Sequence, residues 1–356
     1  MPCVSTPPLS ALTTLRLGGP AARMVTVEDD VALLAAVAAA DAAGEPLLVL
    51  AGGSNVVVAD EGFPGTVVRV ATRGVEKFAM SDGRLRLDVA AGETWDPLVA
   101  CCVQQGLSGI EALSGIPGSV GATPIQNVGA YGQEVADVLI GVRALDRLTG
   151  EVHELDTEAC LFGYRSSVFK RDPGRWLVLR VRFALEVTPL SEPIRYAELA
   201  ARLGIDEGER APLGEVRDAV LALRRAKGMV LDSGDPDTFS AGSFFTNPIL
   251  RAREFDAFAA RAADRLGAGV RPPAWPVEER LVKTSAAWLI ERAGFARGHG
   301  DPSGIAISSK HTLALTNRGS GTARELVARA REIADAVHEA FGVRLVPEPV
   351  LVGLQW

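Results

Sequence analysis

The feature that most constrains this chain is a glycine-rich segment in its first half, GIEALSGIPGSVGATPIQNVGAYG, at residues 109–132. It holds six glycines, two prolines and a single charged residue, Glu111. Neither the helical nor the strand repeat of apolar residues fits it for long. A segment of this kind inside a compact protein is usually functional. Its main-chain N–H groups and hydroxyls suit a flat neutral ring and a pyrophosphate, and the alternative is a structural loop that closes a sheet.

The segments around it mix helical and strand patterns. We expect helices at residues 31–43, 94–105, 212–227, 251–266, 284–293 and 322–341. Strand patterns occur at 47–50, 56–58, 66–70, 85–90, 138–145 and 176–185, and the C-terminus is strand-like. Strands dominate the first half and helices the second, without regular alternation. The pattern therefore predicts an α+β protein and not a doubly wound parallel sheet.

Composition and charge narrow the class of protein. The chain has 356 residues, which suggests two or three domains. Its net charge of -7 argues against non-specific nucleic-acid binding, which needs a basic surface. The N-terminus has no signal-peptide pattern, and the longest apolar run, Val31 to Ala40, is too short to span a membrane and is typical of a buried helix. We expect a cytoplasmic protein that binds neither nucleic acid nor membrane.

Metal-ligating residues are scattered. The four cysteines form no CxxC pair, and the four histidines form no HExxH motif or cluster with cysteine. Cys101 and Cys102 fall in an apolar helical run, so we expect both in the core. We therefore expect no metal site.

A second glycine-rich loop, AGGSN at residues 51–55, follows the apolar strand LLVL. Glycines allow backbone N–H groups to approach an anion. The dinucleotide-binding fingerprint requires GxGxxG at the start of a helix, whereas another strand follows here. The sequence thus favours either a strand–loop–strand anion site or a tight hairpin that binds no ligand.

Three further segments contain residues capable of chemistry. Arg165 lies in FGYRSSVFK, where an arginine among aromatic residues pairs with a carboxylate or phosphate, or forms a structural ion pair. Ser243 lies in AGSFF, without a GxSxG motif, so it is either a proton donor in a dry pocket or a turn serine. Glu348 lies between two prolines and is either exposed on an edge or buried with a raised pKa.

Taken together, IPGSVGATPIQNVGAYG, AGGSNVVV, FGYRSSVFK, AGSFFTNP and PEP resemble, in this order, the UDP-N-acetylenolpyruvoylglucosamine reductase (MurB) family, from about Thr13 to Leu354. The resemblance implies a vanillyl-alcohol-oxidase-type (PCMH-type) FAD-binding fold of two subdomains plus a MurB-type α+β substrate-binding domain. It implies residues 1–71 and 72–228 for the subdomains, with 342–356 returning to the site, and 229–341 for the substrate domain. It also implies non-covalent FAD, NADPH as co-substrate, UDP-N-acetylglucosamine enolpyruvate as substrate and UDP-N-acetylmuramate as product. We expect a monomer.

The resemblance also implies roles for residues. Hydride from flavin N5 adds to C3 of the enolpyruvyl group, Arg165 stabilises the resulting enolate with Glu348 assisting, and Ser243 protonates C2. FAD binding is implied for Gly52, Gly53, Ser54, Asn55, Pro117, Gly118, Ser119, Gly121, Ala122, Thr123, Gln126, Asn127 and Gly129. Substrate binding is implied for Tyr131, Tyr164, Tyr196, Lys227 and Asn247, with the last three around the UDP diphosphate. From its sequence position alone, Lys227 could equally be a solvated charge at a helix end.

Two alternatives stay open. An FAD-dependent sugar or alcohol oxidase of the same fold would share AGGSN but has no need of Ser243 or Glu348. A non-catalytic FAD or nucleotide-sugar binding protein has no need of Arg165, Ser243 and Glu348 together.

Overall fold

The structure is a computed structural model that describes residues 7–278 and 280–356, and the chain forms two compact units. Among the described residues, the first unit comprises Ala21–Gly53 and Phe63–Val230. The second comprises Pro7–Pro20, Ser54–Gly62 and Leu231–Trp356. The chain therefore passes from one unit to the other inside the AGGSN loop. The expected division at residues 71, 228 and 341 is finer and stays a prediction.

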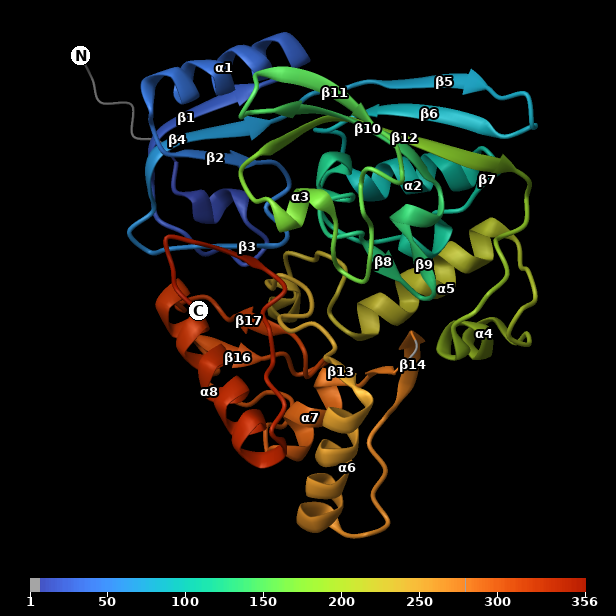
Figure 1. Cartoon of the computed structure of the whole chain (residues 1–356), viewed down its shortest axis with the longest axis vertical. Coiled ribbons are helices and arrows are strands. Elements are labelled where there is room, and N and C mark those ends of the chain that lie inside the picture. Colours follow the sequence, from blue (N-terminus) through green and yellow to red (C-terminus); the bar gives the residue numbers. More distant parts are fainter. Residues whose placement is uncertain (1–6, 279) are drawn as a thin grey trace. The chain divides into compact units, whose positions relative to one another are not determined.

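The first unit contains a small parallel sheet with one covering helix (Figure 1). Its order is β1 (Ala21–Val27), β4 (Phe63–Val70) and β2 (Leu47–Leu50), and α1 (Asp30–Ala43) connects β1 to β2. Helix α1 begins where the Asp29 side chain accepts a hydrogen bond from the Ala32 N–H at 2.7 Å.

Helix α1 buries a single stripe. Leu33, Val37 and Ala40 are buried, whereas Val31 is 78% exposed. The expectation of a buried helix over the run Val31 to Ala40 is thus wrong for the face of α1 that carries Val31, which contacts solvent. An alanine-rich helix has little contrast between its faces, so the composition of the run did not show that one side contacts water.

A larger antiparallel sheet forms the rest of the framework of this unit, in the order β11-β10-β12-β6-β5, with β7 beside β12 (Figure 1). The bounds are Glu151–Leu155, Leu139–Asp146, Trp176–Val187, Leu85–Ala90, Val75–Ala79 and Leu107–Ser108, respectively. The central strand β12 buries Leu179, Val181 and Phe183, and Trp95 packs against Phe183 with ring centroids 5.9 Å apart.

Trp95 begins helix α2 (Trp95–Gln104), which carries the two neighbouring cysteines. Cys102 is buried as expected, but Cys101 is exposed. Successive residues of a helix point about 100° apart, so adjacent positions rarely both face the core.

The glycine-rich segment forms only short elements. They are η2 (Glu111–Leu113), η3 (Val120–Ala122) and the small ladder of β8 (Gly129–Ala130) with β9 (Gln133–Glu134), followed by η4 (Val135–Asp137). Helices α3 (Val168–Arg171), α4 (Ala197–Leu203) and α5 (Leu213–Ala226) follow. This confirms that neither a long helix nor a long strand occupies residues 109–132.

The second unit is built around helices. Its helices are α6 (Ala252–Leu266), α7 (Ala286–Arg292), α8 (Ala323–Phe341), η1 (Leu9–Leu12) and η5 (Pro236–Thr238), and its strands are β3 (Val56–Val58), β13 (Ile249–Arg251), β14 (Trp275–Glu278), β15 (Leu281–Lys283), β16 (Ile305–Ile307), β17 (Leu315–Asn317) and β18 (Val350–Val352). They form the sheets β13-β15-β14 and β16-β17 and the parallel pair β18-β3.

Helix α8 shows why the sequence specified it well. Thr322 and Glu325 form the expected capping box, and Gly342 ends the helix at φ 72°. Leu326, Ala330, Ile333 and Val337 recur at helical spacing, and all four are buried. They pack in a core that includes Phe244, Phe258 and Phe341.

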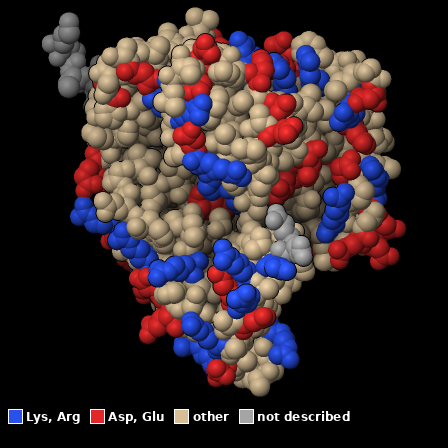
Figure 2. All heavy atoms as spheres, viewed as in Figure 1, with Lys and Arg blue, Asp and Glu red and all other residues tan. Residues whose placement is uncertain are grey.

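Acidic and basic side chains are mixed over the face drawn in Figure 2. No helix in residues 7–278 and 280–356 is long and apolar enough to cross a membrane.

Candidate functional site

Two glycine-rich loops meet in the first unit. A Cβ added to Gly52 would lie 2.5 Å from Gly118 Cα and 2.8 Å from Gly118 C, and Gly118 itself has φ 119°. Only glycine permits this backbone approach without displacement. Residues assigned to FAD from two distant segments, AGGSN and IPGSVGATP, are thus neighbours.

The expected FAD also fits the polar groups beside this contact. Ser119 is 4% exposed, and its hydroxyl has no hydrogen-bond partner among the described residues. A buried hydroxyl without a partner costs free energy, so a polar ligand group at this position would remove that cost. Gly121 lies against Ala91, because an added Cβ would come within 2.5 Å of the Ala91 Cβ.

The AGGSN loop does not turn a hairpin. Strand β2 before it pairs with β4, and strand β3 after it pairs with β18. The ligand-free alternative of a tight hairpin is therefore wrong. The strand–loop–strand arrangement is confirmed, with Gly53 at φ 58°.

Arg165 is held against the glycine-rich segment. Its guanidinium donates to the Asn127 carbonyl at 3.2 Å and to the Gly129 carbonyl at 2.6 Å, and it lies 5.4 Å from the centre of the Tyr164 ring. Its φ of 51° is unusual for a residue with a side chain. The orientation of the Arg165 side chain is therefore fixed by the same loop that carries the residues assigned to FAD.

Asn127 has a different part in this loop. Its side-chain amide donates to Glu134 at 2.6 Å and to the Gly163 carbonyl at 3.3 Å, and its carbonyl oxygen accepts from the Ala136 N–H at 3.0 Å. The side chain joins the loop to the FGYRSSVFK segment, and its assignment to FAD stays a prediction.

Three residues assigned to the substrate form one cluster in the first unit. The rings of Tyr131 and Tyr196 meet edge to face at 5.4 Å. Lys227 Nζ lies 5.7 Å from the centre of the Tyr131 ring and 2.6 Å from the Glu198 carboxylate. Lys227 is thus more than a solvated charge at the end of α5. Burial raises the pKa of Tyr131 to about 12, so its hydroxyl stays protonated and can donate a hydrogen bond.

In the second unit, the backbone brings the segments of Ser243 and Glu348 together. Phe245 and Pro347 form an isolated antiparallel β-bridge, and the Glu348 N–H donates to the Phe244 carbonyl at 2.8 Å. Both side chains are half-buried. No hydrogen bond to the Ser243 hydroxyl occurs in the described part of the chain. Arg165 belongs to the first unit and makes the contacts of that unit.

Asn55 and Asn247 also belong to the second unit. The Asn55 amide donates to the Glu348 carbonyl at 3.3 Å, and the Val350 N–H donates to the Asn55 carbonyl at 3.0 Å. Asn247 accepts from the Ala286 N–H at the start of α7 at 3.0 Å. Asn55 therefore fixes the backbone of Glu348, and Asn247 contributes to capping a helix.

Arg224 is a further candidate for the site that no sequence motif indicated. It donates to the Met229 carbonyl at 2.8 Å, while its buried Nε has no partner among the described residues. Burial lowers the pKa of this guanidinium, and Tyr131 and Asp96 oppose that shift. A buried cation of this kind suits an anionic ligand group. The signal was its spacing from Val216 and Val220, because a charge in register with buried residues of a helix needs a partner.

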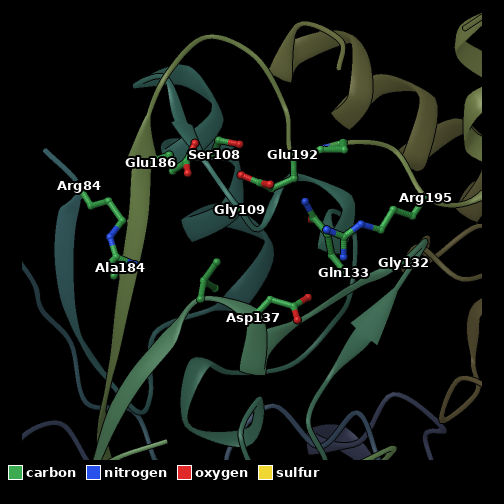
Figure 3. Close-up of a pocket in the computed structure, with 12 residues that line it drawn as sticks. Arg84, Ser108, Gly109, Gly132, Gln133, Asp137, Ala184, Glu186, Glu192 and Arg195 are labelled. Atoms are coloured by element: carbon green, nitrogen blue, oxygen red, sulfur yellow. The ribbon is translucent and has the colours of Figure 1, made fainter. Parts of the chain in front are cut away.

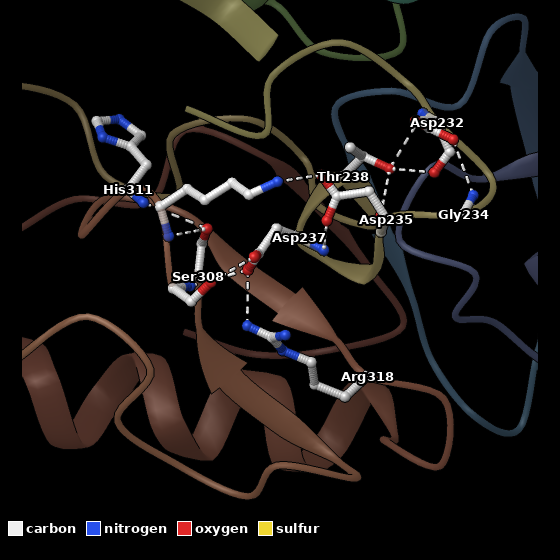
Figure 4. A network of polar contacts seen from close by, with 10 residues as sticks. Asp232, Gly234, Asp235, Asp237, Thr238, Ser308, His311 and Arg318 are labelled. Atoms are coloured by element: carbon white, nitrogen blue, oxygen red, sulfur yellow. Dashed lines mark hydrogen bonds and ion pairs between the residues drawn. The ribbon is translucent and has the colours of Figure 1, made fainter. Parts of the chain in front are cut away.

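A second missed feature is the polar network before Ser243 (Figure 4). Asp237 is 3% exposed and accepts from the Ser309 hydroxyl at 2.6 Å, the Ser309 N–H at 2.8 Å and Arg318 at 2.6 Å. Lys310 pairs with Asp235 at 2.5 Å. Residues 235–237 are thereby fixed to the segment 309–318, and AGSFF follows directly.

No group of histidine, cysteine, aspartate and glutamate in residues 7–278 and 280–356 is arranged to hold a metal ion. Cys160 is buried, and Cys3 lies outside the described residues.

Known proteins resemble this chain over nearly its whole length. Residues 21–156 match the family model of an FAD binding domain, and residues 235–352 match that of the C-terminal domain of UDP-N-acetylenolpyruvoylglucosamine reductase. The reductase of Streptomyces coelicolor is 58% identical, with 98% of this chain and 89% of that protein covered. The reductase of Thermobifida fusca is 56% identical, with 98% and 97% covered.

A solved structure agrees with these matches. The reductase (MurB) of Thermus caldophilus shares 27% of its residues with this chain, covers 97% of each chain and has a TM-score of 0.62. With the FAD-binding match, this confirms the expected fold class.

Proposed function

Because the chain belongs to the UDP-N-acetylenolpyruvoylglucosamine reductase family, we propose that it reduces UDP-N-acetylglucosamine enolpyruvate to UDP-N-acetylmuramate with NADPH. It is an oxidoreductase with an FAD-binding domain. The observation that carries the proposal is the cluster of Tyr131, Tyr196 and Lys227. These are residues that the family motifs assign to the substrate.

FAD, when bound, supplies to C3 of the substrate the hydride that it receives from NADPH. The chain's residues then have to stabilise the charge that develops toward the substrate carboxylate and to protonate C2. We assign the first task to Arg165, since its guanidinium is fixed by two backbone carbonyls and needs little reorganisation. Glu348 assists, and its backbone is tied to Phe244 and Asn55.

Ser243 donates the proton to C2. A serine hydroxyl is a weak acid, so it transfers a proton efficiently only where the developing carbanion is a strong base and water is excluded. The buried Phe244 and Phe245 beside it support an apolar setting. The half-exposed hydroxyl is not committed to a hydrogen bond in the described part of the chain.

Lys227 and Tyr196 bind the diphosphate, with Asn247 from the second unit assigned by its motif. Lys227 is paired with Glu198 in this structure, so a diphosphate would compete with that carboxylate for the ammonium. Tyr131 and Tyr164 line the substrate pocket. We further propose that the protein acts in the cytoplasm and as a monomer.

An anaerobic titration tests the proposal. Purified protein should be yellow, lose its flavin absorbance with NADPH and regain it with the enolpyruvyl substrate, with UDP-N-acetylmuramate formed in equal amount. Bleaching of the flavin by a simple sugar, with recolouring only by oxygen, would favour the oxidase alternative. A protein that binds FAD but never bleaches with NADPH would favour the non-catalytic alternative.

A further inference from the structure

The first unit contains a polar pocket that none of the roles above uses (Figure 3). Its volume is about 300 Å³, at the small end of the range of ligand sites. The walls come from β7, β9, η4, β12 and the segment before α4. The lining residues are Arg84, Ser108, Gly109, Gly132, Gln133, Asp137, Val138, Ala184, Glu186, Glu192, Pro193 and Arg195.

One wall of this pocket has an unsatisfied polar group. Ser108 is 1% exposed, and its hydroxyl has no hydrogen-bond partner among the described residues. Ser108 lies opposite Glu186 in the pairing of β7 with β12. Such a group is stabilised when a ligand in the pocket accepts from it or donates to it.

Two of the three lining carboxylates, Glu186 and Glu192, lie toward Ser108, and the third, Asp137, accepts a hydrogen bond from the Glu134 N–H at 2.7 Å. Figure 3 shows the Glu192 side chain directed toward the side where Ser108 and Glu186 lie. The negative charges of Glu186 and Glu192 are only weakly balanced by Arg210, because it is 3.7 Å from Glu192 and 3.9 Å from Glu186. Burial raises the pKa of Glu192, with Glu186 and Glu111 adding to the shift and Arg210 and Arg195 opposing it. A cationic ligand group would relieve this repulsion.

The other side of the pocket offers a cation. Arg195 lies beside Gln133 in Figure 3, and no ion pair or hydrogen bond to its guanidinium occurs in the described part of the chain. Arg84, in contrast, is already paired with Asp82 at 2.8 Å. Arg195 is therefore the lining arginine that is available to bind a carboxylate.

We propose that this pocket binds a small zwitterion of the α-amino-acid class. Its ammonium group lies toward Glu186, Glu192 and Ser108, and its carboxylate is bound by Arg195. The buried network of Glu111 and Gln133 gives the site a fixed wall, because the Gln133 amide donates to Glu111 at 2.8 Å and the Glu192 N–H donates to the same carboxylate at 2.9 Å.

Position in the chain gives the pocket a regulatory consequence, which rests on the proposed function. Glu192, Pro193 and Arg195 line the pocket, and Tyr196 follows immediately. A zwitterion that bridges Arg195 to the carboxylates restrains the segment that places Tyr196 against Tyr131. Occupancy of the pocket should therefore change the KM for the nucleotide substrate, with kcat nearly constant.

Calorimetric titration of FAD-loaded full-length protein with L-alanine tests the binding. The matched single-charge probes are acetate and ethylammonium. We expect saturable binding of L-alanine, with a Kd on the order of 1 mM, and binding at least tenfold weaker for either probe. Arg195→Ala should weaken L-alanine binding about tenfold and Ser108→Ala about fivefold, from the usual strengths of charged and neutral hydrogen bonds. Arg202→Ala, which removes an exposed arginine of α4 outside the lining, should leave it unchanged.

Absence of L-alanine binding to the wild type overturns the proposal, as does equal binding of acetate and L-alanine. A Kd that is unchanged in both Arg195→Ala and Ser108→Ala also overturns it. The titration needs no turnover, so its failure is distinct from failure of the proposed reaction. If L-alanine binds but leaves the KM unchanged, the regulatory consequence is wrong and the site stands.

Discussion

At Lys227, a single ammonium lies between a carboxylate and an aromatic ring. Glu198 is 2.6 Å away and the Tyr131 ring centre 5.7 Å away. The carboxylate lowers the positive charge that this site presents to a ligand. In the role proposed for Lys227, the diphosphate would therefore compete with Glu198 for the ammonium.

Removing the ammonium should weaken binding more than chemistry. Lys227→Ala should raise the KM for the nucleotide substrate about 10- to 100-fold, the value of a charge-assisted hydrogen bond, with kcat nearly unchanged. Glu198→Gln should lower the KM, because it releases Lys227. Steady-state kinetics measure both, with Lys77→Ala on β5 as the control. A large loss of kcat at constant KM for Lys227→Ala would reject the assignment.

Individual residues were predictable where a motif surrounds them. Arg165, Ser243 and Glu348 were proposed from their segments, and their assigned roles stay predictions. Arg224 and Asp237 were missed because their importance comes from burial, and burial depends on partners distant in sequence. For Asp237 these partners are Ser309 and Arg318.

Elements were predictable where their signals are local. The capping box of α8 and the glycine after α1 are both contained in a few residues, and both helices form as expected. Strands β1, β5 and β11 had no expectation. Strand β1 pairs with the distant β4, whereas β5 and β11 pair with the neighbouring β6 and β10 but have no buried residue, so neither shows an alternation of buried and exposed positions. The pairing of β3 with β18, which excludes the hairpin, joins the first quarter of the chain to its C-terminus.

The contact of the two glycine-rich loops makes a sharp prediction for FAD binding. Gly52→Ala places a Cβ 2.5 Å from Gly118 Cα, so the loops must separate. We expect the affinity of Gly52→Ala for FAD to be at least tenfold lower than that of the wild type. Gly214→Ala is the matched control, because its added Cβ meets no atom within 4 Å. Fluorescence titration of apoprotein measures both, and equal FAD affinity in the two mutants would contradict the assigned role of the loops.

The Asp237 network predicts a pH effect on stability. Burial alone would raise the pKa of Asp237, but hydrogen bonds from Ser309 and the charge of Arg318 outweigh it and lower the pKa. A carboxyl with a lowered pKa contributes stability above its unfolded value, near 3.8, and loses it as the pH falls through the folded value. Asp237→Asn should therefore lower the unfolding free energy by about 2 kcal/mol at pH 7.

At a pH below the folded pKa of Asp237, the wild type and Asp237→Asn should converge in stability. Urea unfolding over a pH series measures this, with Asp301→Asn as the control for an exposed carboxylate that also has a lowered pKa. A constant difference between Asp237→Asn and the wild type at all pH values would show that packing, and not charge, is responsible.

At the scale of the whole molecule, the proposed reaction depends on both units. Arg165, the FAD loops and the tyrosine–lysine cluster belong to the first, and Ser243 and Glu348 belong to the second. The order of motifs along the chain predicted the fold class, which the comparisons confirm. It did not predict that the chain passes between the units within AGGSN, because that crossing depends on contacts of β3 with the distant β18.

The proton transfer assigned to Ser243 is the central claim, and stopped-flow absorbance of the two half-reactions tests it most directly. Ser243→Ala should be reduced by NADPH at a near-normal rate, because the hydroxyl has no part in that step. Reoxidation by the enolpyruvyl substrate should slow by about 10²–10⁴-fold, the usual contribution of a general acid. Ser243→Cys, with an S–H in the same place, should recover part of the rate. If Ser243→Ala is reoxidised at the wild-type rate, the proton comes from another group and the assignment is wrong.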